Sequence, residues 1–307
     1  MPSGPGTHPG LVRAAVGGTY EVELYPGTAN ARVVEAVLRG RLKQEQRTGD
    51  AVVVGDRVRV LSHEDGSHTI EAVGDRVSEL ARRAPGGRHR AKVVVANVDQ
   101  LVAVFSVAEP APRLRMLDRF LVLAEANDLD GVVVANKVDL DDEAGSAFRV
   151  YEEIGYPVVW TSARDGTGLD RFREVLRDRV SVLAGPSGVG KSSLLNGIQP
   201  GLGLRTARIS DAVGKGRHTT VSAVLIALDC GGYVADTPGL RELGLWGVDP
   251  GELDACFPEL RPHLGDCRFR SCSHTHEPGC AVLEAVEAGE VDRARYASYR
   301  ALLEGDD

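Results

Sequence analysis

The pattern of apolar and polar positions changes twice along the 307-residue chain, and over the first 83 residues or so it predicts β-structure. Up to about residue 83, short runs rich in β-branched residues alternate with turn residues, with no helical pattern between them. Five strands are predicted, over 19–24, 33–38, 51–61, 68–73 and 78–83. Five short strands are typical of a small closed barrel, so we expect an OB-fold domain over 1–83. Residues 1–10 are rich in glycine and proline and are expected to be disordered.

The middle of the chain alternates apolar runs with helical periodicity, which indicates a mostly parallel sheet flanked by helices. The predicted strands are 101–107, 132–135, 157–161, 180–184, 223–229 and 232–235. The predicted helices are one around 117–124 and others over 143–154, 169–178 and 191–198. We therefore predict an α/β domain over 84–246 that begins with a basic linker over 84–92.

The last segment, 247–307, has a helical pattern from Ala281 onward. A domain of about 60 residues is only marginally stable through apolar burial alone, so we expect another source of stability. A bound metal ion could supply it, because the segment contains three thiols and an imidazole within 14 positions. They are Cys267, Cys272, His274 and Cys280, with His276 as a competing fourth ligand. This donor set favours one structural zinc ion in a mostly helical domain.

A phosphate-binding loop is predicted between the strand at 180–184 and the helix at 191–198, because the residues there match G-x-x-x-x-G-K-S in its required context. Backbone N–H groups of the loop are expected to bind the β-phosphate, Lys191 the β- and γ-oxygens, and Ser192 the Mg²⁺ that accompanies GTP. The loop and the start of its helix comprise Gly185, Pro186, Ser187, Gly188, Val189, Gly190, Lys191, Ser192 and Ser193.

Two further loops predict guanine specificity. A carboxylate at Asp139 can accept hydrogen bonds from N1 and the exocyclic amine of guanine, whereas adenine offers no matching pair of donors. The loop after the next strand supplies a backbone N–H for guanine O6. The residues concerned are Asn136, Lys137, Asp139, Ser162 and Ala163. The first motif alone could also be a helix cap, but the two loops together favour GTP over ATP.

The γ-phosphate side of the site is predicted from Asp236-Thr237-Pro238-Gly239, which could otherwise be a plain β-turn. Asp236 would lie in the second shell of Mg²⁺, and the Gly239 N–H near the γ-phosphate. Position 240 is leucine, which cannot orient water, so another group must do so. His218 is the candidate, with an RNA contact as the alternative. Either Thr219 or Thr220 would complete the Mg²⁺ shell.

Charge is distributed unevenly. The net charge is −8, but the first 92 residues carry 14 Lys/Arg against 11 Asp/Glu and the remainder 22 against 33. The N-terminal third, and residues 82–92 above all, is therefore the better candidate for contact with a phosphate backbone, the alternative being a solvated linker. With no long apolar run and no apolar leader, we expect a cytoplasmic protein without a membrane partner. No long heptad pattern calls for a second subunit, so a monomer is expected.

The three motifs stand in the order 136–139, 185–192 and 236–239, whereas a Ras-like GTPase has its phosphate loop first and its guanine motif last. The predicted elements fill every position of a Ras-like sheet if the old chain ends are joined between residues 178 and 180, so we predict that 84–246 is a circularly permuted GTPase domain. This motif order, the His218-Thr219-Thr220 segment and the cysteine spacing together resemble the circularly permuted ribosome small-subunit-dependent GTPases. The resemblance runs from Val54-Gly55-Asp56 to Val282, with Val221 departing from the third threonine common in that family. It implies binding to the small ribosomal subunit and its rRNA late in maturation, with hydrolysis of GTP to GDP there. By the same resemblance Asn136, Asp139, Ser162, Lys191, Ser192, Asp236 and His218 take the roles given above, and Cys267, Cys272, His274 and Cys280 bind the zinc. The residues expected to serve catalysis are thus His218, Lys191, Asp236 and Gly239, and those expected at magnesium are Ser192 and Thr220 or its neighbour Thr219.

Two other functions are compatible with the same motifs. One is an RNA-binding assembly placeholder that binds nucleotide but turns it over little. The other is a P-loop ATPase.

Overall fold

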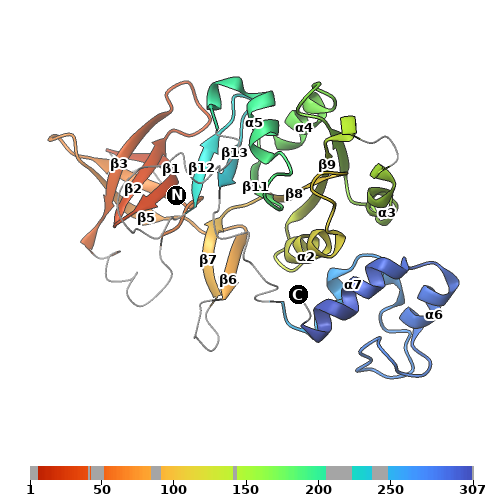
Figure 1. Ribbon diagram of the computed structural model, residues 1–307. Coiled ribbons are helices and arrows are strands. Elements are labelled where there is room, and N and C mark those ends of the chain that lie inside the picture. The colour runs from red at the N-terminus through yellow and green to blue at the C-terminus, as the bar shows by residue number, and fades with distance from the viewer. Residues whose placement is uncertain are drawn as a thin grey trace. The chain divides into compact units, whose positions relative to one another are not determined.

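The computed structural model describes residues 6–40, 42, 52–83, 91–140, 144–204, 223–236 and 248–305 (Figure 1). The chain divides into two compact units. The first unit comprises Met1–Gln100, Leu169–Leu183 and Ser192–Arg241. The second comprises Leu101–Gly168, Ala184–Lys191 and Glu242–Asp307.

The first unit begins with a five-stranded barrel. Its strands are β1 (Thr7–Val16), β2 (Thr19–Leu24), β3 (Arg32–Leu38), β4 (Arg57–Ser62) and β5 (His68–Val73). They follow the order β1-β2-β3-β5-β4, and β4 pairs back onto β1, which closes the barrel. Only the β3–β5 pair is parallel among these neighbours. Inward-facing apolar side chains such as Val22, Val60 and Ile70 are fully buried. The predicted OB-fold is confirmed.

Two details of the barrel prediction were wrong. Residues 7–10 are not disordered, because they form the start of β1; residues 1–5 lie outside the described part of the chain. The glycine and proline there suit close packing: a Cβ on Gly10 would lie 2.6 Å from Val22 Cγ1. The run predicted as the fifth strand is β6 (Glu79–Arg83), which pairs with β7 (Ala91–Ala96) in a separate sheet because β1 already lies beside β4.

The remaining strands of the first unit extend from the barrel. β12 (Val224–Ala227) pairs with β1 on one side and with β13 (Tyr233–Asp236) on the other, and β13 pairs in parallel with β11 (Val180–Ala184). The helices beside them are α4 (Leu169–Leu176), α5 (Lys191–Ile198) and the 3-10 turn η3 (Pro200–Leu202). Of the predicted linker, β7 contains residues 91 and 92, and 84–90 lie outside the described residues.

The second unit has its own parallel strands and helices. β8 (Gln100–Ser106) neighbours β9 (Asp130–Asn136), which pairs in parallel with β10 (Val158–Thr161). α2 (Leu114–Glu125) follows β8, and the 3-10 turns η1 (Val138–Leu140) and η2 (Ala144–Phe148) lead to α3 (Arg149–Ile154). The predicted helix over 143–154 is thus a 3-10 turn followed by an α-helix. The turn lies close against the next strand, since a Cβ on Gly145 would lie 2.6 Å from the Trp160 ring.

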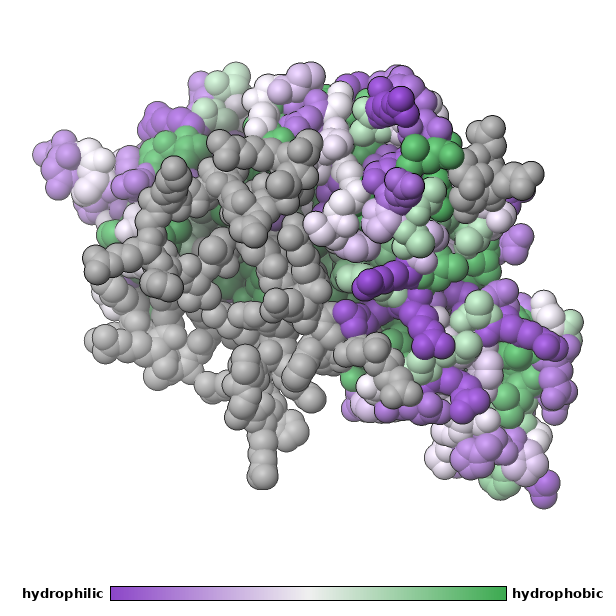
Figure 2. Space-filling view, in the orientation of Figure 1, coloured by the Kyte–Doolittle hydropathy of each residue, from purple (hydrophilic) through white to green (hydrophobic). Residues whose placement is uncertain are grey.

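The C-terminal part of the second unit is helical, as predicted. It contains η6 (Asp254–Cys256), η7 (Arg261–His263), α6 (Ala281–Ala288) and α7 (Arg293–Glu304). Phe257, Leu260 and Val282 are buried in its core, which also receives Val122 from α2. Figure 2 shows both hydrophilic and hydrophobic residues on the surface of this part, at the lower right. Among the described helices, none is long and apolar enough to cross a membrane.

Candidate nucleotide site and metal centre

The phosphate loop has a backbone that only glycine can adopt at three points. Gly185, Gly188 and Gly190 have φ values of 137°, 82° and 104°. A Cβ on Gly185 would lie 2.1 Å from the Val104 carbonyl oxygen of β8. The apolar strand β11 leads into this loop and α5 leaves it. The loop therefore has the strand–loop–helix context that directs backbone N–H groups toward an anion.

Lys191 lies at the first position of α5 and folds over the loop. Its Nζ donates to the carbonyl oxygens of Gly185 and Pro186, both at 2.7 Å. These bonds hold the ammonium group at the mouth of the loop. Ser192, the next residue, is 8% exposed.

Asn136 joins the base-reading motif to the phosphate loop. Its Nδ2 donates to the Val189 carbonyl oxygen at 2.7 Å, and its Oδ1 accepts from Thr161 Oγ1 at 3.0 Å. A Cβ on Gly190 would lie 2.2 Å from the same Nδ2, so the loop approaches this side chain as closely as glycine allows. Asn136 is 1% exposed. The amide group of Asn136 thus connects the end of β9 to the phosphate loop through its nitrogen and to the end of β10 through its oxygen.

Asp139 and Ser162 form the second contact between the base-reading loops. Ser162 Oγ donates to Asp139 Oδ1 at 2.7 Å. Asp139 Oδ2 lies 3.5 Å from Nη1 of the exposed Arg164. Ser162 is buried and also fixes its own loop, since its N–H donates to the Thr167 carbonyl oxygen at 2.9 Å. The structure therefore brings the Asp139 carboxylate to the start of the loop that contains Ala163.

Lys137 has a left-handed backbone, with φ 66°. Its Nζ donates to the carbonyl oxygen of Glu109, in the segment after β8. Pro110, the next residue, lies beside Gly188 of the phosphate loop. Glu109 could not be identified from the sequence, because it contributes a backbone carbonyl oxygen and no side-chain atom.

The γ-phosphate side is described only at Asp236, the last residue of β13. His218, Thr219, Thr220 and Gly239 lie outside the described residues. Asp236 pairs with Val224 of β12 in the antiparallel ladder. Thr237, which follows Asp236 in the sequence, is also outside the described part of the chain.

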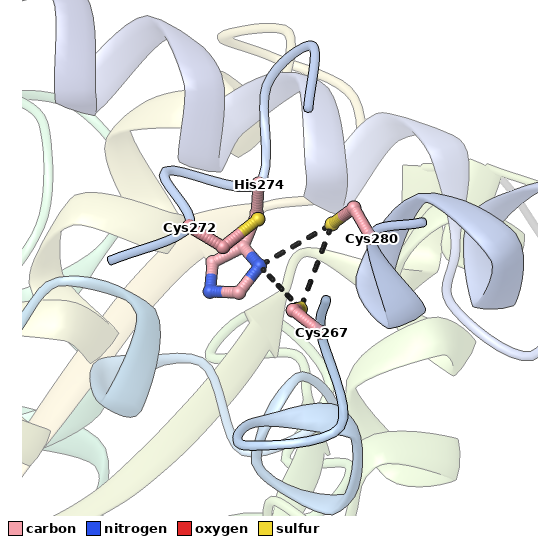
Figure 3. Close-up of side chains that lie close together, drawn as sticks. All are labelled: Cys267, Cys272, His274 and Cys280. Atoms are coloured by element: carbon pink, nitrogen blue, oxygen red, sulfur yellow. Dashed lines mark hydrogen bonds between the residues drawn. The ribbon is translucent and has the colours of Figure 1, made fainter. Parts of the chain in front are cut away.

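The four predicted metal ligands of the C-terminal segment converge, and their ligand atoms lie within 4.8 Å of one another (Figure 3). His274 Nδ1 lies 3.5 Å from Cys267 Sγ and 3.4 Å from Cys280 Sγ, and the two sulfur atoms are 3.9 Å apart. Burial raises the pKa of the Cys272 thiol, so a cation is needed to favour its thiolate. The competing ligand His276 is exposed, and the cluster contains His274 instead.

Groups around the cluster hold the histidine in place. His274 Nε2 lies 3.3 Å from Asp254 Oδ2, and the His274 carbonyl oxygen accepts from Tyr296 at 2.7 Å. Glu277 accepts hydrogen bonds from Ser273, both hydroxyl and N–H at 2.7 Å, and these bonds lower its pKa below the usual range. Sequence spacing identified the four ligands but not Asp254, which is 20 residues from His274.

The fold and these loops define a class of protein: a circularly permuted P-loop GTPase with an N-terminal OB barrel and a C-terminal Cys₃His cluster. Residues 73–246 match the RsgA GTPase family. The chain belongs to that family.

Similar proteins match over almost the whole chain. It is 52% identical to the small ribosomal subunit biogenesis GTPase RsgA of Gemmatimonas aurantiaca, covering 94% of each chain. It is 43% identical to that of Moorella thermoacetica, covering 96% of each. The crystal structure of YjeQ from Thermotoga maritima is similar with a TM-score of 0.79 at 38% identity, covering 98% of each chain. YloQ, described as a circularly permuted GTPase, has a TM-score of 0.76 at 32% identity, covering 100% of this chain and 98% of that one.

Proposed function

We propose that this chain is a cytoplasmic, monomeric GTPase that binds the small ribosomal subunit, assists its late maturation and hydrolyses GTP faster when bound there. The observation that carries the proposal is the Asn136 side chain, which bonds to the phosphate loop and to the second base-reading strand. These two hydrogen bonds support a single site that combines guanine recognition with phosphate binding. The names of the relatives supply the small subunit as the partner.

Guanine recognition is assigned to the two loops that meet at Asp139. The carboxylate accepts from N1 and the exocyclic amine of the base, while the Ala163 N–H donates to O6. Ser162, bonded to Oδ1 at 2.7 Å, keeps the carboxylate oriented. Adenine would leave this carboxylate without donors, which is the physical basis for excluding ATP.

Phosphate binding is assigned to the phosphate loop and α5. On GTP binding, Lys191 exchanges the Gly185 and Pro186 carbonyl oxygens for phosphate oxygens. Ser192, one threonine of the 219–220 pair and, through water, Asp236 would hold Mg²⁺, which neutralises charge on the β- and γ-phosphates. His218 orients or deprotonates the attacking water, and the Gly239 N–H binds the γ-phosphate.

The metal of the Cys₃His cluster is proposed to be one structural zinc ion. With Zn–S near 2.3 Å and Zn–N near 2.0–2.1 Å, tetrahedral geometry requires S···S of about 3.8 Å and S···N of about 3.5 Å. The separations of 3.9, 3.5 and 3.4 Å among Cys267, His274 and Cys280 are close to these values and support the proposal, and the Cys272 ligand atom lies within 4.8 Å of the other three. Four protein ligands leave no open position, and Asp254 fixes the tautomer in which His274 Nδ1 is free to ligate.

The barrel is proposed to contact rRNA, mainly through phosphates, and the three predicted segments 1–83, 84–246 and 247–307 act as barrel, GTPase domain and metal domain. Tyr20 of β2 is 5% exposed, so its ring is not available to stack on a base, and phosphate contact is the better supported mode.

The test is GTP turnover with and without purified small subunits, with large subunits as the matched control and ATP as the competing nucleotide. Stimulation by small subunits alone, unaffected by excess ATP, is the expected result. Tight binding without stimulation would establish the placeholder function instead. Turnover of ATP at the GTP rate would refute guanine specificity.

A further inference from the structure

Arg13 lies where β1 passes from the barrel to β12, and its side chain contacts both. The first half of β1 pairs with β4 inside the barrel, and its second half pairs with β12 through Ala14 and Val224 (Figure 1). Between these halves the register of β1 against β2 shifts, and Arg13 lies at the shift. A β-bulge of this kind redirects a side chain.

Arg13 uses its whole guanidinium group at this junction. Its Nε and Nη2 both donate to the Leu225 carbonyl oxygen of β12, at 3.2 Å each. Its Nη1 lies 3.5 Å from Glu23 Oε2 of β2. Glu23 is 7% exposed, and this oxygen accepts no hydrogen bond from the described residues, so Arg13 is its charge partner.

A residue of β13 completes the cluster. Tyr233, the first residue of β13, lies beside Glu23; burial, and then the charge of Glu23, raise the pKa of Tyr233 to about 12. The cluster thus spans β1 and β2 of the barrel and both strands of the β12–β13 hairpin.

The same two strands lead to the γ-phosphate side of the site. Val224, which pairs with Ala14 of the barrel, also pairs with Asp236 at the end of β13. Ala14, Val224 and Asp236 therefore lie side by side across the three neighbouring strands β1, β12 and β13. Arg13 donates to Leu225, the residue after Val224 in β12. The β12–β13 hairpin therefore cannot shift in register against β1 without breaking these hydrogen bonds.

We propose that Arg13, held by Glu23, is a positioning residue for Asp236, so that barrel and nucleotide site influence each other through β12. This extends the proposed GTPase function and rests on it for the role of Asp236. It requires no contact between Arg13 and nucleotide. Because such coupling is reciprocal, nucleotide bound with Mg²⁺ must also stabilise the second half of β1.

The first test is hydrogen exchange on the full chain, without ribosomes. GDP with Mg²⁺ should slow exchange at Ala14, Ala15 and Val16 several-fold, within the range of about 5–150-fold typical of coupled sites. In Arg13→Met, nucleotide should still protect α5 but no longer these three amides. Arg39→Met is the control, because Arg39 pairs with Glu71 elsewhere on the barrel, and it should behave as the unmodified protein.

Two conservative variants separate positioning from folding. Arg13→Lys keeps the charge for Glu23 but offers one donor group, so it should retain part of the protection. Glu23→Gln keeps the size of the side chain but loses the ion pair, so it should also lose part of the protection. Equal β1 protection in all variants, or none in the unmodified protein, would overturn the proposal.

The second test is turnover stimulated by small subunits. In Arg13→Met the stimulated kcat should fall about 5-fold or more, with KM for GTP and subunit binding unchanged. If subunits fail to stimulate the unmodified protein while β1 is protected by nucleotide, the proposed function fails and the positioning role stands. An unchanged stimulated kcat in Arg13→Met, where the unmodified protein is stimulated, would overturn the positioning role.

Discussion

Arg295 of α7 is a buried cation whose removal should destabilise the second unit strongly. Its Nη1 donates to Asp118 Oδ1 of α2 at 2.6 Å, and its Nε donates to Glu259 Oε1 at 2.7 Å. The three side chains are only 2%, 2% and 8% exposed. Burial alone would lower the pKa of Arg295, but Asp118 and Glu259 outweigh it and raise that pKa above its ordinary value.

Arg295→Met keeps most of the side-chain volume but leaves two buried carboxylates without their cation. Removing one partner of a buried ion pair costs about 3–5 kcal/mol, because the remaining charge is uncompensated. This is a large share of the roughly 5–15 kcal/mol by which folded domains are stable. The free energy of unfolding is measured by urea denaturation, followed by near-ultraviolet circular dichroism.

The matched control is Arg300→Met on the same helix. Arg300 pairs with Glu304 at 2.9 Å, but the two side chains are 47% and 50% exposed. Exposed pairs are screened by solvent and contribute little to stability, so the free energy of unfolding of this variant should be nearly unchanged. Equal destabilisation by both substitutions would refute the argument from burial.

A double variant tests the cause more directly. Asp118→Asn in the Arg295→Met background removes one of the uncompensated charges and keeps an oxygen to accept from Tyr151, now bonded at 2.6 Å. The double variant should therefore be destabilised by less than the sum of the two single changes. Strict additivity would show that the charges do not interact.

Four further outcomes are expected. Asp139→Asn should weaken GTP binding by about 3–6 kcal/mol, from two charge-assisted bonds of about 1.5–3 kcal/mol each, and improve xanthosine triphosphate binding; unchanged affinity in a fluorescent-nucleotide titration would remove it from the site. Gly190→Ala should lower nucleotide affinity at least about tenfold, whereas Gly201→Ala, where no atom lies within 4 Å, should not. Cys272→Ala or chelation should unfold the C-terminal helices, seen by hydrogen exchange, with nucleotide affinity retained; loss of both together would place the metal in the nucleotide site. His218→Ala should retain GTP and subunit binding yet lose about 10²-fold or more of the stimulated rate, unless the subunit supplies the catalytic group.

Local signals were enough for much of this structure. Residues 180–184 and 191–198 form β11 and α5 with the predicted bounds, because an apolar strand, a glycine-rich loop and a helix follow one another without interruption. The Cys₃His ligands converge as their spacing predicts.

The failures concern pairings between distant residues. β1 was not predicted because glycine and proline occur at its start, and Gly10 allows close contact with Val22 of β2 and Val58 of β4. The alternation of β6 shows that it is a strand, but it cannot show that its partner is β7. The bond from Asn136 to Val189 joins residues 53 apart, and that from Arg295 to Asp118 joins residues 177 apart. No local pattern contains such information.

In the proposed function, the circular permutation connects the barrel and the C-terminal segment 248–305 to the strands that lead to the γ-phosphate side, and these are the two segments added to the GTPase domain. In the usual order of a Ras-like chain, both switch segments are internal, with core strands before and after them. Here the segment 237–247 leads from β13 directly into the C-terminal residues 248–305, and β12, which follows the segment 205–222, pairs with the barrel strand β1. A barrel held by RNA would therefore act on β12, and a metal-stabilised domain would act on the chain that leaves Asp236. A ligand bound at the barrel or at the C-terminal segment can change nucleotide binding only if these contacts with β12 and β13 differ between its free and bound states. The hydrogen bonds from Arg13 to Leu225 are one such contact.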